Sequence, residues 1–331
     1  MKKYLYIAIA AATLASCSQD EVMEVAEKEA ITFGNVFVGK STRAAEDPGY
    51  SGTADLTSFQ VWGAINAANN TPVAIFADDA IGGTVGQGSV WENTDKSKQQ
   101  YWIYGATYNF AAVVNTDLKD GKSDVTLGTN LLPQTINYTA DGTKDLLYAE
   151  AKNIVRQATD TEKKVSMNFS HLLSKVKFTA VNTTTDTDYT FNIKNLTITN
   201  SPAKGTYYVQ KVSDDKPAGK WDITNPNGTT TIGDIDAVVY GSKDAFECEE
   251  EKFLIPADFT STKLNISYTL EWVYAGNVIT STPVTATASV DLKAGYAYNF
   301  QISTALNAPI QFTVTQDPSW TTATDQPVTV Q

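Results

Sequence analysis

Histidine, cysteine and arginine are scarce in this chain of 331 residues, and the scarcity of the first two excludes familiar kinds of chemistry. The only histidine, His171, lies in the apolar stretch NFSHLLSKV, where nothing nearby marks a nucleophile. A Ser-His-Asp or Cys-His constellation needs such a histidine as its base. We therefore interpret His171 as a structural residue that bonds a backbone group. One histidine and one free cysteine also cannot build a typical zinc site.

Other chemical signatures are missing as well. The sequence has no Walker-type loop and no glycine cluster with dinucleotide-binding spacing. Acidic pairs such as Asp214-Asp215 lack EF-hand spacing, and we interpret them as solvated turns. With 37 acidic residues, a carboxylate pair suited to glycoside hydrolysis could arise by chance. We predict a protein that is not an enzyme and that needs no cofactor and no metal.

Charge and aromatic content narrow the range of partners. The chain carries 25 basic and 37 acidic residues, a formal net charge of −12, which argues against nucleic acid as a partner. Its six tryptophans are spread along the sequence, one to a segment. Sandwich cores use aromatic residues in this way, whereas a sugar-binding platform is the functional alternative.

The first sixteen residues have the features of a secretory signal. Met1-Lys2-Lys3 supplies positive charge, and the apolar run YLYIAIAAATLA is too short for a spanning helix. The run ends in Leu14-Ala15-Ser16-Cys17, which resembles the lipobox of bacterial lipoproteins. We predict that residues 1–16 are removed and that Cys17 is lipidated. An ordinary cleavage site with an incidental cysteine is the alternative.

The residues that follow Cys17 suggest where the protein goes. Ser18-Gln19-Asp20-Glu21 resembles the surface-export signals of lipoproteins in some Gram-negative bacteria, and a generic tether is compatible with this. We predict a surface-exposed lipoprotein of the cell outer membrane, held by a lipid anchor. No later stretch is long and apolar enough to span a bilayer. With Cys17 assigned to lipid, Cys248 has no partner and no disulfide forms within the chain.

Most of the remaining sequence has the pattern of β-strands. Apolar residues alternate with polar ones, with many Val, Ile, Thr and aromatic residues, over 56–65, 108–114, 175–181, 189–199 and 263–274. Frequent turn signals separate these runs. The pattern predicts an all-β fold with few short helices, built as two tandem β-sandwich domains over residues 44–163 and 164–331. The stretch Lys144–Asp160 remains open between helix and strand.

A further strand-like segment lies ahead of these domains, within the predicted tether of residues 17–43. Arg43, in the polar loop that follows, is one of only two arginines, and the other is Arg156. A protease specific for arginine would therefore have almost nowhere else to cut, although 23 lysines against two arginines could also reflect compositional bias. The apolar residues of the segment, which alternate for part of the run, are Ile31, Phe33, Val36, Phe37 and Val38.

Several motifs occur in an order that resembles the fimbrillin family, the subunits of type V pili. The most specific are FSHLLSKVKF (169–178) and GYAYNFQI (295–302). Others are ITFGNVFVGKSTRA, WIYGATYNFAAVV, DLLYAEA, KGTYY and FLIPADF. Together with the lipobox and the acidic tether, the ordered set covers most of the chain.

The resemblance implies a fold and a mechanism. It implies transthyretin-like sandwiches of Greek-key type, in a precursor that an Arg-specific surface protease cuts between Arg43 and Ala44. The cut releases the first strand, and a strand from another fimbrial subunit fills the exposed groove by β-strand addition. The candidate donor strand lies within residues 309–331, where the alternating apolar residues are Ile310, Phe312, Val314, Val328 and Val330.

The sequence thus predicts a structural subunit of a cell-surface fimbria that serves adhesion. Its partners would be other fimbrial subunits, the processing protease and the outer membrane before processing. The alternative is a non-polymerising, tip or accessory fimbrillin-like lipoprotein that binds host glycans or proteins. Such a protein would keep its first strand or lack a free donor. A surface glycosidase is a third reading, with only acidic residues in its favour.

Overall fold

The computed structural model describes residues 29–38, 56–66, 71–83, 90–114, 123–161, 164–239 and 251–317. Within these ranges almost all regular structure is β, which confirms the predicted fold class. The only helical element there is the short 3₁₀ turn η2 (Lys96–Lys98). The part of the chain described contains no helix that is long and apolar enough to cross a membrane.

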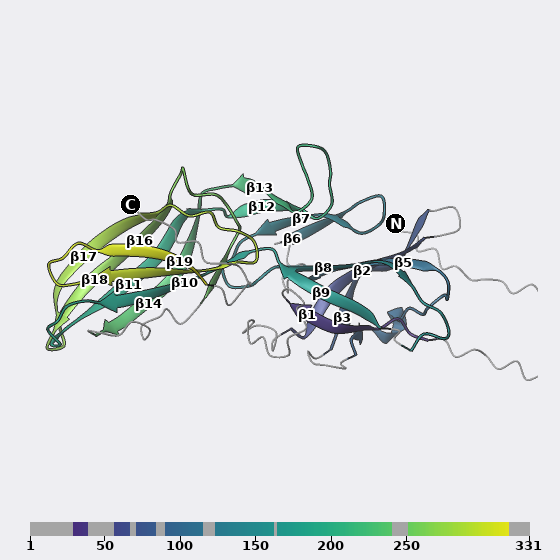
Figure 1. Cartoon of the computed structure of the whole chain (residues 1–331), viewed down its shortest axis with the longest axis horizontal. Coiled ribbons are helices and arrows are strands. Elements are labelled where there is room, and N and C mark those ends of the chain that lie inside the picture. The colour runs from purple at the N-terminus through teal and green to yellow at the C-terminus, as the bar shows by residue number, and fades with distance from the viewer. Residues whose placement is uncertain are drawn as a thin grey trace, which may run out of the picture.

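Seven strands form the largest sheet, in the order β1-β9-β8-β5-β2-β3-β4 (Figure 1). Its central strand β5 is apolar on both sides because Phe110 and Ala112 face one cluster of buried residues, whereas Ala111 and Val113 face another. The bounds are β1 Phe33–Val38, β2 Ser58–Asn66, β3 Pro72–Gly82, β4 Glu92–Asn93, β5 Thr107–Val114, β8 Leu147–Val155 and β9 Val165–His171.

A four-stranded sheet in the order β13-β12-β7-β6 lies across one face of the large sheet. The cluster between the two sheets includes Trp62 of β2, Ile136 and Tyr138 of β7, and Trp221 of β13. The cluster on the opposite face of the large sheet includes the buried side chains of β1. The bounds are β6 Ser123–Leu127, β7 Pro133–Thr139, β12 Lys204–Tyr208 and β13 Lys220–Asn225.

Two further four-stranded sheets, β15-β10-β18-β19 and β14-β11-β16-β17, face each other across a third cluster. Along β16, the residues Leu264, Ile266, Tyr268, Leu270 and Trp272 are buried and their neighbours are not, as their alternation predicts. The bounds are β10 Ser174–Asn182, β11 Tyr189–Ser201, β14 Gly228–Val238, β15 Lys252–Leu254, β16 Leu264–Tyr274, β17 Asn277–Ala288, β18 Ala297–Thr304 and β19 Gln311–Asp317.

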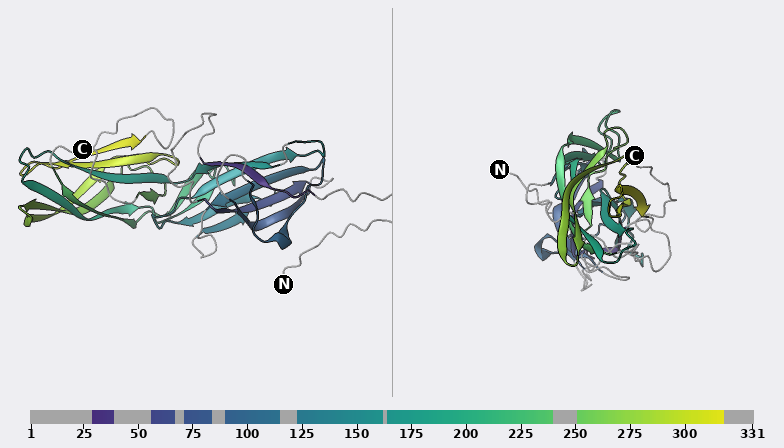
Figure 2. Two further views of the ribbon diagram at one scale, coloured as in Figure 1. Left: turned by 90° about the horizontal axis from the view of Figure 1, so that it is seen from below. Right: turned by 90° about the vertical axis from the view of Figure 1, so that its left-hand side faces the viewer.

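The two pairs of sheets follow one another along the long axis of the molecule (Figure 2). The domain boundary predicted between residues 163 and 164 does not separate the strands completely. β9 pairs with β1 and β8, and β12 pairs with β7, so residues 165–171 and 204–225 join the sheets of the first half. We propose that the second sandwich begins at Ser174 and that residues 204–225 return to the first.

His171 lies near this passage from one pair of sheets to the other. The prediction that it bonds a backbone group missed a side-chain partner, because its Nδ1 contacts the Asp145 carboxylate, and both residues are buried. Burial raises the pKa of Asp145, and the contact with His171 opposes the rise. The partner comes from the loop before β8, 26 residues earlier, so the local sequence gave no sign of it.

The segment that was open between helix and strand, Lys144–Asp160, contains β8. β8 pairs with β5 from Leu147 to Val155, and its buried residues Leu147 and Ala149 alternate. The helix propensity of the Leu, Ala, Glu and Lys residues is therefore overridden by pairing with β5.

We expect Phe300→Ala to lower the free energy of unfolding by about 3–5 kcal/mol. Phe300 is completely buried and stacks on Phe178 with ring centroids 5.0 Å apart, so truncation leaves a cavity between the second pair of sheets. Urea unfolding would measure the loss. The matched control Val278→Ala, at a half-exposed position, should change the free energy by less than about 0.5 kcal/mol. Similar losses in both variants would contradict this placement of the core.

Candidate functional site: the slot of the first strand

The candidate site is the slot that strand β1 occupies at the edge of the seven-stranded sheet (Figure 1). On one side β1 runs parallel to β9, with Phe33 opposite Val165 and Gly34 opposite Ser166. Phe37 and Val38 continue the pairing opposite Asn168 and Phe169. β1 therefore completes the sheet through main-chain bonds and is not merely laid over it.

The other side of β1 is covered by residues 91–102, which we call the strap. Phe33 and Trp91 exchange two backbone hydrogen bonds of 2.9 and 2.8 Å. The Ile31 N–H donates to the Gln100 carbonyl at 2.8 Å, and the Trp102 N–H donates to the Glu29 carbonyl at 2.9 Å. Because β1 has partners on both sides, it is an inner strand over this stretch, although it is first in the sheet order.

The side chains of β1, and of Ile31 two residues before it, fill the core beneath the strap. Ile31, Phe33 and Val36 are 1%, 0% and 4% exposed. The Phe33 ring makes edge contacts with Phe59, Phe76 and Phe110 at centroid distances of 5.8, 5.8 and 5.6 Å. Edge-to-face packing of this kind is favourable beyond simple burial. Phe33 is thus the central side chain of its cluster.

An irregularity in β1 explains why its alternation is incomplete. Between Gly34 and Phe37 the chain advances three residues, while β9 advances two, from Ser166 to Asn168. Asn35 and Val36 together oppose Met167, which is the arrangement of a β-bulge. The extra residue shifts the alternation, so that Phe33 and Val36, three positions apart, are both buried.

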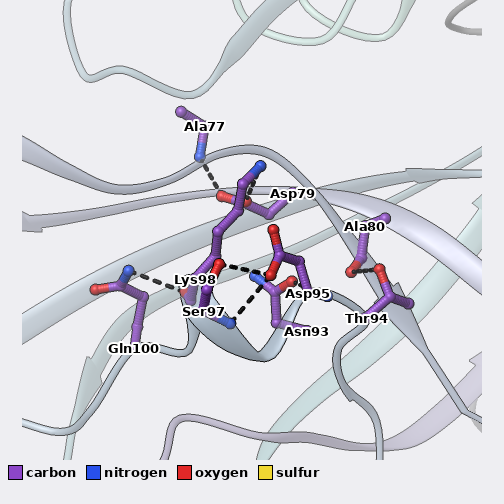
Figure 3. A network of polar contacts seen from close by, with 9 residues as sticks. All are labelled: Ala77, Asp79, Ala80, Asn93, Thr94, Asp95, Ser97, Lys98 and Gln100. Atoms are coloured by element: carbon purple, nitrogen blue, oxygen red, sulfur yellow. Dashed lines mark hydrogen bonds and ion pairs between the residues drawn. The ribbon is translucent and has the colours of Figure 1, made fainter. Parts of the chain in front are cut away.

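Polar contacts hold the strap against β3 (Figure 3). The Lys98 ammonium lies 3.4 Å from the carboxylate of Asp79, which also accepts a hydrogen bond from the Ala77 N–H at 2.9 Å. Thr94 bonds the Ala80 carbonyl through both its N–H and its hydroxyl. The strap is therefore fixed to the sheet and does not depend on β1 alone for its position.

Asp95 caps the turn η2 within the strap. Its carboxylate accepts from the Ser97 hydroxyl at 2.6 Å and from the Ser97 N–H at 3.0 Å, and these bonds lower the pKa of Asp95. Nearby, burial raises the pKa of Tyr108, whose hydroxyl accepts a 2.7 Å bond from the Ile103 N–H. At neutral pH Asp95 is therefore ionised and Tyr108 is neutral. Their hydrogen bonds fix the conformation of the strap and of the turn that follows it.

Arg156, the other arginine of the chain, is held by several contacts at the end of β8. Its guanidinium lies 5.7 Å from the ring centroid of Trp102 and donates a 2.9 Å bond to the Lys164 carbonyl. Its own carbonyl accepts from the Gly105 N–H at 2.8 Å. A protease needs an extended and accessible segment, so these contacts make Arg156 a poor site. Arg43, Ala44 and Cys17 lie outside the described residues.

Only part of the candidate donor strand lies within the described residues. Ile310 precedes β19, and Phe312 and Val314 lie in it; β19 pairs with β18 at an edge of the second sandwich. Val314 is 1% exposed, whereas Ile310 and Phe312 are only partly buried against the core. Val328 and Val330 lie outside the described residues.

The remaining candidates have structural roles. Trp62, Trp91, Trp102 and Trp272 are buried, which confirms their interpretation as core residues. Trp221 is partly buried, and its Nε1–H donates to the Leu172 carbonyl at 2.9 Å. Among the described residues, no group of three or more His, Cys, Asp or Glu side chains could hold a metal ion.

The strap was not predicted from the sequence, because no local pattern in residues 91–102 indicates that they pair with the first strand. Trp91 and Gln100 lie about sixty to seventy residues from their β1 partners, and only isolated bridges connect the segments. The sequence spacing of Asp79 and Lys98 likewise does not indicate that the two residues form an ion pair.

Comparison with protein families identifies the relatives of this arrangement. A model of the fimbrillin-like family matches residues 42–318. The chain belongs to the fimbrillin-like family. The resemblance inferred from the ordered motifs is thereby confirmed. A comparison with curated proteins found no match.

Solved structures share the fold of this fimbrillin-like chain at low sequence identity. A candidate cell adhesion protein from Bacteroides ovatus is 16% identical, with a TM-score of 0.55 over 92% of this chain and 99% of the other. A fimbrial protein from Bacteroides vulgatus is 14% identical, with a TM-score of 0.53 over 86% and 98% of the two chains. At these identities the likeness establishes the fold alone.

We expect Gly63→Ala to destabilise the first half by about 1–3 kcal/mol through overpacking. A Cβ atom at Gly63 would lie 2.9 Å from ring atoms of both Phe76 and Phe110, the two rings that contact Phe33 from the sheet centre. Urea unfolding followed by tryptophan fluorescence would report the change. The control Ser58→Ala, at an exposed position of the same strand, should be neutral within about 0.5 kcal/mol.

We also expect Asp79→Ala to loosen the strap more than Lys98→Ala. The aspartate variant leaves the Ala77 N–H without its acceptor and removes the ion pair, a loss of about 1–3 kcal/mol. The lysine variant removes only a half-exposed ion pair, a loss of at most about 1 kcal/mol. Hydrogen exchange at the Phe33 and Trp91 amides would measure the loosening. Equal exchange rates in the two variants would show that Asp79 does not hold the strap.

Proposed function

We propose that this chain is a structural subunit of a cell-surface fimbria, polymerised by β-strand exchange and serving adhesion. It is made as a lipoprotein precursor anchored to the outer membrane through Cys17, and it is cut between Arg43 and Ala44. Membership of the fimbrillin-like family supports the fimbrial role. The observation that carries the mechanism is the seating of β1 between β9 and the strap.

The contacts of β1 indicate how much free energy its departure would cost. The buried side chains Phe33 and Val36 of β1, with Ile31 just before it, contribute about 1.5–3 kcal/mol each. Its backbone bonds to β9 and the strap would be left without partners in a dry groove if the strand departed alone. A vacated slot therefore strongly favours a replacement strand, and a bound replacement would dissociate slowly.

The two arginines support a single cut. Arg156 has a stacked guanidinium and a bonded carbonyl, whereas the predicted site at Arg43 follows β1 directly along the chain. A cut at Arg43 would leave β1 held only by noncovalent contacts. Cleavage would thus convert a built-in strand into an exchangeable one.

A second candidate function is a non-polymerising tip or accessory protein that binds host glycans or proteins. The observation in its favour is the strap, because an inner strand with partners on both sides resists removal. In that case the chain would remain a monomer after the cut. No observation favours an enzymatic role.

We expect an Arg-specific protease to cut the chain starting at Ser18 once, after Arg43, with a ladder of oligomers following on unboiled gels. Arg43→Lys should abolish both the cut and the ladder, whereas Arg156→Lys should change neither. Mass spectrometry would locate the cut. A clean cut with a stable monomer would favour the tip or accessory role, and resistance of the wild-type chain would refute processing at Arg43.

A further inference from the structure

The inference concerns a group of exposed side chains at one end of the first sandwich, and it rests on the lipid anchor of the proposed function. β5 begins at Thr107 opposite Val155, whereas the other end of β8, at Leu147, pairs with His171 near the passage between the sandwiches. The end at Thr107 is therefore the one remote from the second sandwich (Figure 1). Four exposed side chains there, which we call the end patch, are Tyr101 (45%), Ile103 (59%), Tyr104 (38%) and Val155 (40%).

The loop that carries the end patch is fixed by hydrogen bonds. Trp102, between two residues of the patch, is buried, and its N–H donates to the Glu29 carbonyl at 2.9 Å. The Ile103 N–H donates to the Tyr108 hydroxyl at 2.7 Å, and the Tyr104 hydroxyl donates to the Glu29 carboxylate at 2.6 Å. The exposure of these apolar side chains is thus a property of the folded loop.

The end patch lies where the chain enters the first strand. Glu29, which bonds both Trp102 and Tyr104, is the first residue that the structure describes. Cys17, the predicted site of lipidation, comes twelve residues earlier. A fully extended chain of that length spans at most about 40 Å. The anchor therefore keeps the end patch close to the bilayer, and this end of the molecule is nearer to the anchor than the other.

We propose that the end patch rests on the surface of the bilayer that holds the lipid anchor. Tyrosine suits this position, because its ring is apolar and its hydroxyl can remain among the headgroups. Ile103 and Val155 supply aliphatic surface that can enter the acyl boundary. The charged residues around the patch have both signs, so apolar burial and not attraction to anionic lipid makes the contact. They are Glu29, Asp160, Arg156 and Lys164.

The contact would give the anchored protein one orientation, which a lipid anchor alone does not do. From Glu29 the chain runs toward Val38, which lies opposite Phe169 at the other end of β9. In an extended chain the distance from Glu29 to Val38 is about 25–30 Å. With the end patch on the bilayer, Val38 is held away from the lipid. Arg43 follows Val38 by five residues, so the proposed cut would begin from the side that faces the medium.

The contact can be tested with lipids that carry a nitroxide quencher. The lipoprotein with Cys248→Ser, lipidated at Cys17, is reconstituted in phosphatidylcholine vesicles. A fluorophore is attached at Val155→Cys in the end patch or, as the matched control, at Val278→Cys in the second sandwich. Both valines are exposed, so neither label disturbs the core. The lipidated Cys17 has no free thiol, so each protein carries a single label.

We expect the nitroxide lipids to quench the label at Val155→Cys at least about threefold more strongly than the label at Val278→Cys. Replacing Tyr101 and Ile103 together by Gln should lower the quenching at Val155→Cys to the control level. The matched variant Ile279→Gln, also at an exposed position, should leave it unchanged. Equal quenching at the two labels overturns the proposal. Quenching that persists in the double Gln variant also overturns it, because the tether alone would then explain the proximity.

Salt separates apolar contact from electrostatic attraction. Raising NaCl from about 0.05 M to about 0.5 M shortens the screening length severalfold but leaves apolar burial intact. The quenching at Val155→Cys should therefore persist at the higher concentration. A fall to the control level would show that charge makes the contact, and the apolar patch would lose its proposed role.

The outcomes for the proposed function are separate. If mass spectrometry finds Cys17 without lipid, the proposed anchoring fails and this inference fails with it. If the chain is lipidated and cut after Arg43 but the two labels are quenched equally, the proposed function stands and the inference falls. If the double Gln variant instead changes the sedimentation of the lipid-free chain starting at Ser18, the end patch binds a second copy and the proposal is overturned.

Discussion

The packing of Phe33 among Phe59, Phe76 and Phe110 is the contact on which the first half of this molecule depends. No disulfide is expected within the chain, so the first strand stays in place through apolar burial and main-chain bonds alone. Another strand of the right pattern could supply both kinds of interaction, which is what the proposed strand exchange requires.

Because the strap lies on the side of β1 that faces away from β9, β1 occupies a slot between two segments and not an open sheet edge. The bonds of the strap go to main-chain atoms of residues 29–33, so they do not depend on the side chains there, and its own anchorage on β3 through Asp79, Thr94 and Lys98 is independent of β1. Two kinds of contact therefore hold β1 in its slot. β9 and the strap bond its main chain, while the apolar cluster beneath packs against its side chains.

The two ends of the described chain are seated differently. β1 and Ile31 just before it place three side chains in full burial and are bonded on both sides, whereas β19 buries one and is paired only with β18 among the described strands. The more weakly seated strand also has the more regular alternation. β1 is thus held more firmly than β19.

The sequence by itself determined the all-β class, the inward face of β16 and the family, because alternation along a strand is a local property and the ordered motifs are read directly. It also marked Ile31, Phe33 and Val36 as apolar. Tertiary structure decided the rest. The bulge that buries Val36, the strap that faces β1, the Asp145 partner of His171 and the return of β12 and β13 to the first sheets all depend on contacts between distant segments. Such contacts leave no period in the sequence, because their geometry is set by which strands meet.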